Sequence, residues 1–140
     1  LSDTVATDFI RGLALVSATS VRVRHSDPAT AASALLEVIG HWERAGNWRQ
    51  QWTTLRQAVE LFTRIGDDKA AAVLLGAIDV HDRNLFGADA ERLSAFRSEL
   101  ETRLGPPAEQ SVAEGRALQP HDVIAFIRRQ LAPLCQVARQ

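Results

Sequence analysis

The sequence has little of what several classes of protein require. It contains one cysteine, Cys135, which excludes a disulfide framework and fits a reducing compartment such as the cytoplasm. No apolar run approaches the roughly 20 residues that a membrane-spanning helix needs, and no signal peptide is recognisable. Because the chain opens at Leu1 without a methionine, we expect it to be a fragment of a longer protein.

Catalytic and metal-binding motifs are also missing. The chain has no GxxxxGK[ST] phosphate loop and no HExxH, CxxC or GxSxG motif. The four histidines are spread along the chain without metal-ligand spacing: His25, His41, His81 and His121. Asp67 and Asp68 are adjacent carboxylates, but their place at a helix start indicates capping and a favourable interaction with the helix dipole. We therefore expect no enzyme activity, no cofactor and no bound metal.

Charge of one sign is not in excess. With 16 Lys and Arg against 17 Asp and Glu, the net charge is -1 and the pI about 6.5, so no overall field attracts nucleic acid or an anionic membrane. Arg128 and Arg129 form only a small basic patch, which makes direct DNA binding the weakest hypothesis. At 140 residues and 46% hydrophobic composition, the chain is long enough for one domain with its own core.

What the sequence does contain is helical periodicity, which is clearest in residues 45–79. Large apolar residues recur there at steps of three and four, as on one side of a helix: Trp48, Trp52, Leu55, Val59 and Phe62. Asn47 and Asp67 are suited to cap the starts of two helices. Gly46 and Gly66 are suited to end the helices that precede those caps. The segment predicts two amphipathic helices joined by a tight turn.

Five further helices are predicted outside this segment. They span approximately residues 3–17, 27–44, 88–104, 108–114 and 120–133. The first carries Val5, Phe9, Leu13 and Val16 at helical spacing. Residues 19–26 are interpreted as the end of that helix or a linker. We expect Gly115 to end the sixth helix in a left-handed conformation and Pro133 to end the last one.

Seven helices joined by short connections predict an all-α fold of stacked antiparallel hairpins, a short tetratricopeptide-like α-solenoid. Gly66 and Gly105 stand 39 residues apart (105 minus 66), which is roughly the period of helical-hairpin repeats. We interpret residues 1–140 as a single domain. Within it, residues 1–26 form an N-terminal helix and linker, residues 27–104 a hairpin core, and residues 105–140 the C-terminal capping helices.

Residues 55–78 resemble a degenerate tetratricopeptide hairpin. The residues that match the repeat are Leu55, Ala58 and Phe62 on its first helix and Ala71, Leu75 and Ile78 on its second. Val59 and Arg83 depart from the repeat, which prefers glycine and proline at these places. The resemblance implies a stack whose concave surface binds peptides.

A second resemblance covers residues 31–127. It is carried by the segments HWERAGNWRQQWTTLRQAVELFTRIGDDKAAAVLLGAID, LFGADAERLSAFRSELETRLG and EGRAL. These are similar to the C-terminal helical region of large actinobacterial regulators, which carry an NTPase module with an adenylate-cyclase-like or a LuxR-type DNA-binding domain. Gln119 departs from the family, which places Ser or Thr there. The resemblance implies a regulatory module of a signal-responsive transcription factor, with ATP binding and DNA reading outside these residues.

A polar stripe on the helix that begins at Trp48 is the candidate partner-binding surface. Its members are three and four residues apart and so share one face: Arg49, Thr53, Arg56 and Glu60. The arginines suit a partner that carries carboxylates. The alternative is a solvated stripe in which Arg56 pairs with Glu60. The partner is expected to be another protein chain or the NTPase domain of the same protein.

The tryptophans support a second hypothesis, a small-ligand sensor. Trp48 and Trp52 are one helical turn apart and, with Trp42, form a set that can line a pocket and stack on a ligand. The alternative is that the three indoles fill the seam between two hairpins. Leu61 and Phe126 are expected on exposed helix faces, where they can seal a homodimer.

Overall fold

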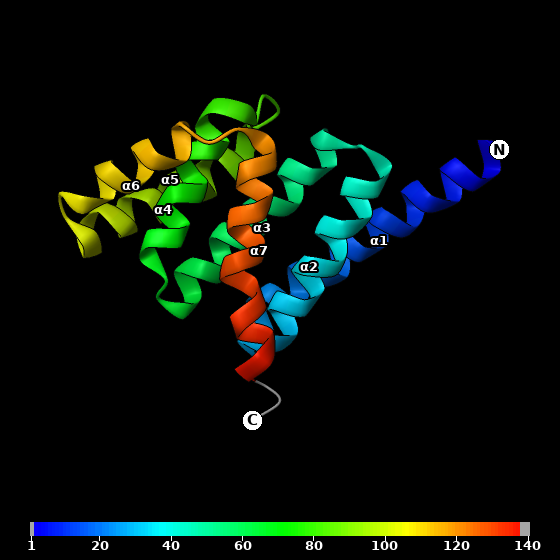
Figure 1. Ribbon diagram of the computed structural model, residues 1–140, viewed down its shortest axis with the longest axis horizontal. Coiled ribbons are helices and arrows are strands. Elements are labelled where there is room, and N and C mark those ends of the chain that lie inside the picture. The colour runs from blue at the N-terminus through cyan, green and yellow to red at the C-terminus, as the bar shows by residue number, and fades with distance from the viewer. Residues whose placement is uncertain (1, 138–140) are drawn as a thin grey trace.

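The computed structural model describes residues 2–137, and every regular element within this range is an α-helix (Figure 1). The helices are α1 (Ser2–His25), α2 (Pro28–Ala45), α3 (Trp48–Ile65), α4 (Asp68–His81), α5 (Gly87–Leu104), α6 (Pro107–Arg116) and α7 (Pro120–Val137). The predicted all-α class with seven helices is thereby confirmed for the described part of the chain.

Polar caps and left-handed glycines fix the boundaries of α2, α3 and α4. The side chains of Asp27, Asn47 and Asp67 accept hydrogen bonds from the backbone amide three residues later, at 3.1, 3.1 and 3.3 Å. Gly46 and Gly66 end α2 and α3 with φ of 66° and 82°, a region that only glycine enters without strain. These turns lie where the sequence predicted them.

Two predicted helix ends are wrong, and one open alternative is decided. Residues 19–25 form the end of the first helix and not a linker, because α1 continues to His25 and buries Val23. Gly115 does not end α6 in a left-handed conformation; it lies within the helix, against α4. Pro133 lies inside α7. Proline has no amide hydrogen, so the carbonyl of Arg129, four residues earlier, has no helical donor. Pro133 and Arg129 are both exposed, so water can donate to this carbonyl instead.

The core lies around α3, which packs against α2 and against α4. Its largest fully buried side chains include Leu35, Trp42, Leu55, Phe62, Leu74 and Ile78. Val59 is also fully buried, so the fold accommodates valine where the tetratricopeptide repeat prefers glycine. Leu61 is buried as well, and Phe126 packs against the core. The prediction that Leu61 is exposed is therefore wrong. α3 contacts α1, α2, α4 and α5, so several of its sides are covered.

α4 and α6 make the most extensive contact between two helices in the described structure. The backbones approach closely because each helix carries a glycine at the crossing. A Cβ atom added to Gly76 would overlap the carbonyl oxygen of Val112, and one added to Gly115 would overlap that of Val73. The absence of a side chain at Gly76 and Gly115 therefore lets the backbones of α4 and α6 lie directly against each other.

α7 does not extend the series of hairpins. It turns back to pack on α2 and, to a smaller extent, on α4, which brings residues 120–137 beside residues 28–45 (Figure 1). The inward residues of α7 are those the sequence predicted: Val123, Ile124, Ile127 and Leu131. At the surface of this contact, Arg128 donates two hydrogen bonds to the Glu43 carboxylate, at 2.8 and 3.2 Å.

The Glu43–Arg128 pair predicts a small acid-sensitive contribution to the docking of α7. The hydrogen bond from Arg128 lowers the pKa of Glu43 below its ordinary value of 4.5. Because the folded-state pKa is depressed, the contribution is present above the unfolded-state pKa and is lost as the pH falls through the folded-state pKa. Both side chains are about 40% exposed, so Arg128→Gln is expected to cost less than about 1 kcal/mol.

Carboxyl NMR titration checks this pair directly. Glu43 is expected to titrate below 4.5 in the wild-type chain and nearer to that ordinary value in the Arg128→Gln variant. Arg129→Gln removes a neighbouring exposed charge and serves as the control, in which the pKa of Glu43 is expected to stay as in the wild type. Identical Glu43 titrations in wild type and Arg128→Gln would contradict the pairing.

Candidate functional site

The predicted polar stripe lies on α3, but the structure divides it. Arg49 is exposed, and Thr53 is half-buried with its hydroxyl donating to the Arg49 carbonyl at 3.3 Å. Arg56 and Glu60 are largely covered, with 11% and 20% of their side chains exposed. Partner binding by this stripe stays a prediction for Arg49 and Thr53, its more accessible members.

Arg56 is committed to contacts within the chain. Its Nε and Nη2 atoms donate to the two oxygens of Asp82 at 2.6 and 2.9 Å, and Nη1 donates to Asp89 at 3.1 Å. Burial lowers the pKa of Arg56, but the hydrogen bond and charge of Asp82 outweigh burial and raise it, so the guanidinium stays charged. The expected Arg56–Glu60 pair is wrong, because Asp82 lies closer to the guanidinium in the folded chain.

Asp82 is the most deeply buried member of this network. Its side chain is 1% exposed, and besides Arg56 it accepts a hydrogen bond from the backbone amide of Asn84 at 3.2 Å. Since Asp82 follows directly after α4, Arg56 of α3 anchors the start of the loop that leads to α5. The pair therefore fixes the path of the chain between two helices.

Glu60 connects three helices. It accepts hydrogen bonds from Arg24 of α1 at 3.1 Å and from Arg92 of α5 at 3.5 Å. The side of the molecule formed by α1, α3 and α5 is thus bridged by ion pairs, with a cavity of only about 100 Å³ between them. This arrangement leaves little room for an acidic peptide beside Arg56 and Glu60.

The three tryptophans take part in two different sets of ring contacts. Trp42 is fully buried and meets Phe9 and His41, with ring centroids 5.9 and 4.8 Å apart. Trp48 and Trp52 lie 6.1 Å from each other, with His121 at 5.4 Å from Trp48 and His81 stacked at 5.5 Å on Trp52. The rings are therefore occupied by neighbours within the chain.

Surface cavities lie away from the tryptophans. Five cavities among the described residues have volumes between about 100 and 590 Å³, and no tryptophan lines any of them. The largest lies between α5 and α6, where Arg97 and Arg116 both donate to Asp79 at 2.8 and 3.1 Å. Both arginines that line this cavity are therefore already paired with a carboxylate of the chain.

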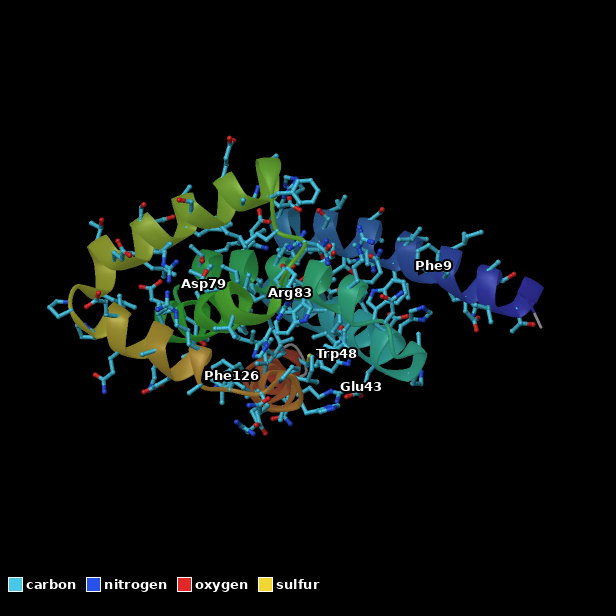
Figure 2. All side chains as sticks on the ribbon, turned by 90° about the horizontal axis from the view of Figure 1, so that it is seen from above. Phe9, Glu43, Trp48, Asp79, Arg83 and Phe126 are labelled. Atoms are coloured by element: carbon cyan, nitrogen blue, oxygen red, sulfur yellow. The ribbon has the colours of Figure 1, made fainter. Side chains whose placement is uncertain are left out.

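The most unusual surface is on the first half of α1. Four large apolar side chains, which we call the α1 row, are exposed to 70%, 40%, 65% and 39%: Val5, Phe9, Ile10 and Leu13. Their helical spacing alone does not show which way they face. In Figures 1 and 2 the N-terminal half of α1 projects beyond the body of helices, which leaves these side chains wholly or partly uncovered.

α1 meets the body at its middle. A Cβ atom added to Gly12 would overlap the Trp42 ring and the His41 imidazole, so the absence of a side chain lets α1 lie on α2 at this point. Phe9, labelled in Figure 2, touches the edge of Trp42 and marks the boundary between the covered and uncovered parts of α1. The spacing of the row alone does not distinguish a docking face from a core face.

Two further findings concern the chemistry that the described residues offer. No three side chains of the His, Cys, Asp and Glu types lie together in a metal-binding arrangement among the residues that the structure describes. None of the helices α1 to α7 is both long and apolar enough to cross a lipid bilayer. Cys135 is half-buried, and Ser33 donates to its sulfur at 3.4 Å.

Comparison of the chain with protein-family models, with curated proteins and with solved structures finds no match. Function is therefore inferred from the residues of the chain and from their arrangement.

Proposed function

We propose that this chain is a non-catalytic, regulatory protein-interaction module that binds an amphipathic helix of a partner through the α1 row. The exposure of that row is the observation that carries the proposal. Val5, Phe9 and Leu13 follow one another at single-turn spacing and form an exposed apolar ridge, whereas Ile10 lies about 100° from Phe9 around the helix axis. Isolated apolar residues are common on protein surfaces, but large apolar side chains grouped in this way are typical of binding sites.

The spacing of the row favours a helical partner. Val5, Phe9 and Leu13 are four residues apart and form a ridge along α1, and such ridges fit the grooves between side chains of another helix. In stacks of helical hairpins, the helix at the end of the stack normally turns a polar face to solvent. α1 turns an apolar face outward, which supports a further helix lying against it.

The biological setting of the proposal comes from the resemblance to large actinobacterial regulators. A tetratricopeptide-like helical region in such a regulator is expected to act in the cytoplasm in signal-dependent control of transcription. Its partner would be another protein chain or the NTPase domain of the same protein. A ligand sensor is not proposed, because the tryptophan rings are packed against other side chains and the described cavities lie elsewhere.

A charge placed on the ridge of the α1 row is expected to weaken partner binding without unfolding the chain. Val5 is on that ridge and 70% exposed, so Val5→Asp would bury an unpaired carboxylate in the interface, which is expected to weaken binding by at least about tenfold. Val80→Asp is the matched control, because Val80 is an exposed aliphatic residue on α4 and the change in charge is the same. Affinity capture from the producing cells, followed by calorimetry with the identified partner, measures the difference.

The structural integrity of the variants is checked by circular dichroism, and both are expected to keep the helical signal of the wild-type chain. Equal affinity of the partner for wild type, Val5→Asp and Val80→Asp would show that binding occurs elsewhere. In that case Arg49→Ala tests the remaining accessible part of the α3 stripe.

A further inference from the structure

We infer that α1 is a lid, a helix that lifts from α2 and α3 and so controls access to the face around Trp42. Its hinge is at its C-terminal end, and polar groups trapped beneath its middle favour opening. Opening takes place in the free chain, so the lid goes beyond the partner binding proposed above and does not depend on it.

The apolar contact of α1 with the body is small for a helix of 24 residues. Among the described side chains of α1, only Val23 belongs to the cluster of buried apolar residues, whereas the side chains of the α1 row are exposed. α2 is shorter, with 18 residues, and buries Leu35, Val38, Ile39 and Trp42. Because buried apolar surface supplies most of the stability of a packed helix, α1 is held less firmly than α2.

Polar atoms are trapped under α1 without hydrogen-bond partners. Six buried side-chain nitrogen and oxygen atoms have no partner among the described residues, and four of them lie at the α1 contact: Thr19 Oγ1, His41 Nε2, Trp42 Nε1 and Gln57 Oε1. Thr19 lies on α1 itself and is 1% exposed. The amide nitrogen of Gln57 donates to the Val16 carbonyl of α1 at 3.3 Å, which places the unpaired oxygen of the same amide beside α1.

Gly12 shows where the other two atoms lie. A Cβ atom added to Gly12 would overlap His41 Nε2 and the Trp42 ring, so both side chains are directly under the middle of α1. A buried polar group without a partner costs free energy, because it has given up its hydrogen bonds to water. Lifting α1 returns water to all four atoms, which makes opening less costly.

The C-terminal end of α1 has better-matched contacts. Val23 is fully buried there, and Arg64 of α3 donates to the carbonyl of Val23 at 2.6 Å and to the carbonyl of Ser26. Arg24 donates to the Glu60 carboxylate of α3 at 3.1 Å. These contacts hold this end of α1 in place while the remainder lifts.

The chain connection makes the same end a hinge. Only Ser26 and Asp27 separate α1 from α2, and the other end of α1 extends beyond the body of helices (Figure 1). Gly12 precedes Val23 by 11 residues (23 minus 12), which is about 16 Å along a helix. A small rotation at the hinge therefore moves the middle of α1 clear of Trp42.

Hydrogen exchange of the Trp42 indole N–H tests the lid. This group is buried under α1 without an acceptor among the described residues, so its proton reaches solvent when α1 lifts. NMR spectra of the isotope-labelled chain in deuterated water follow the signal, which is assigned by its loss in Trp42→Phe. After correction for intrinsic rates, we expect exchange at least about tenfold faster than that of the backbone amides of α4, which report global unfolding.

Two substitutions in α1 are expected to shift the lid in opposite directions. Thr19→Val removes an unpaired hydroxyl at nearly constant volume, so it is expected to favour the closed lid and to slow the exchange by about threefold or more. Gly12→Ala places a methyl group against the buried Trp42 ring, so it is expected to speed the exchange by about tenfold, although alanine favours the helix itself.

Thr54→Val is the matched control for Thr19→Val. Thr54 is also buried, but its hydroxyl donates to the Gln50 carbonyl at 3.2 Å, so its removal is not expected to slow the exchange. An equal slowing in both threonine variants would overturn the inference. So would a Trp42 indole that exchanges as slowly as the α4 amides, or at one rate in wild type, Thr19→Val and Gly12→Ala.

The lid and the proposed partner binding give separate results. Val5→Asp changes the projecting end of α1, away from the trapped polar atoms, and is expected to leave the Trp42 exchange rate within about twofold of the wild type. Partner binding that is unaffected by Val5→Asp would reject the binding surface and leave the lid standing. Exchange that is insensitive to Thr19→Val and Gly12→Ala would reject the lid and leave the binding surface standing.

Discussion

Replacing Gly115 by alanine is expected to lower the free energy of unfolding by about 3 kcal/mol and the melting temperature by on the order of 10 °C. The added methyl group would overlap the Val73 carbonyl oxygen of α4, and a backbone atom cannot move aside as a flexible side chain can. The two helices must separate along their most extensive contact. Urea unfolding followed by circular dichroism measures the loss.

Gly76→Ala tests the same crossing from α4, because its methyl group would overlap the Val112 carbonyl of α6. Since one separation of α4 and α6 relieves both overlaps, the double variant is expected to lose less than the sum of the two single losses. Gly40→Ala is the matched control in α2, where the nearest atom to the new methyl is the Arg44 guanidinium at 3.1 Å.

The control is expected to change stability by no more than about 1 kcal/mol, with alanine's higher helix propensity acting in its favour. If Gly115→Ala and Gly76→Ala are as stable as Gly40→Ala, then α4 and α6 do not cross as closely as described. A loss confined to the two crossing glycines would show that the contact, and not the general replacement of glycine, carries the effect.

Replacing Arg56 by alanine is expected to destabilise the fold by about 3 to 5 kcal/mol, because it leaves the Asp82 carboxylate buried without its charged partner. Arg56→Lys is expected to lie between wild type and alanine, since lysine restores a positive charge but not the paired hydrogen bonds. Arg49→Ala, an exposed position on the same helix, is expected to change stability by less than about 0.5 kcal/mol.

A double variant separates the lost charge pair from lost packing. Asp82→Asn removes the buried charge, so Arg56→Ala with Asp82→Asn is expected to be more stable than Arg56→Ala alone. Chemical denaturation of the four proteins gives the coupling energy. No recovery in the double variant would mean that Arg56 contributes through the contacts of its aliphatic stem, and the ion-pair explanation would be wrong.

The ion pairs explain why the predicted binding stripe differs from the observed surface. The spacing of Arg49, Arg56 and Glu60 places them on one face of α3, as expected. What lies opposite that face depends on the paths of α1 and of the chain after α4, which bring Arg24 to Glu60 and Asp82 to Arg56. Contacts between residues 26 or 36 positions apart leave no periodic signal in the sequence.

The tryptophans also show the difference between spacing within a helix, which the sequence gives, and contacts between helices, which it does not. Trp42 and Trp52 are both buried, which agrees with the alternative that the indoles fill the seam between two hairpins. The stacking of His81 on Trp52 and the contact of His121 with Trp48 required α4 and α7 to be placed in space. Ring contacts between separate helices depend on packing, which local sequence does not specify.

By itself the sequence determined the helices. Their periodicity, the caps at Asp27, Asn47 and Asp67, and the left-handed glycines at 46 and 66 act within a few residues, and local interactions of this kind are readable along the chain. Tertiary structure alone decided which apolar faces are covered. Val5, Phe9 and Leu13 have the same spacing as buried rows, and they are exposed only because α1 extends past its neighbours.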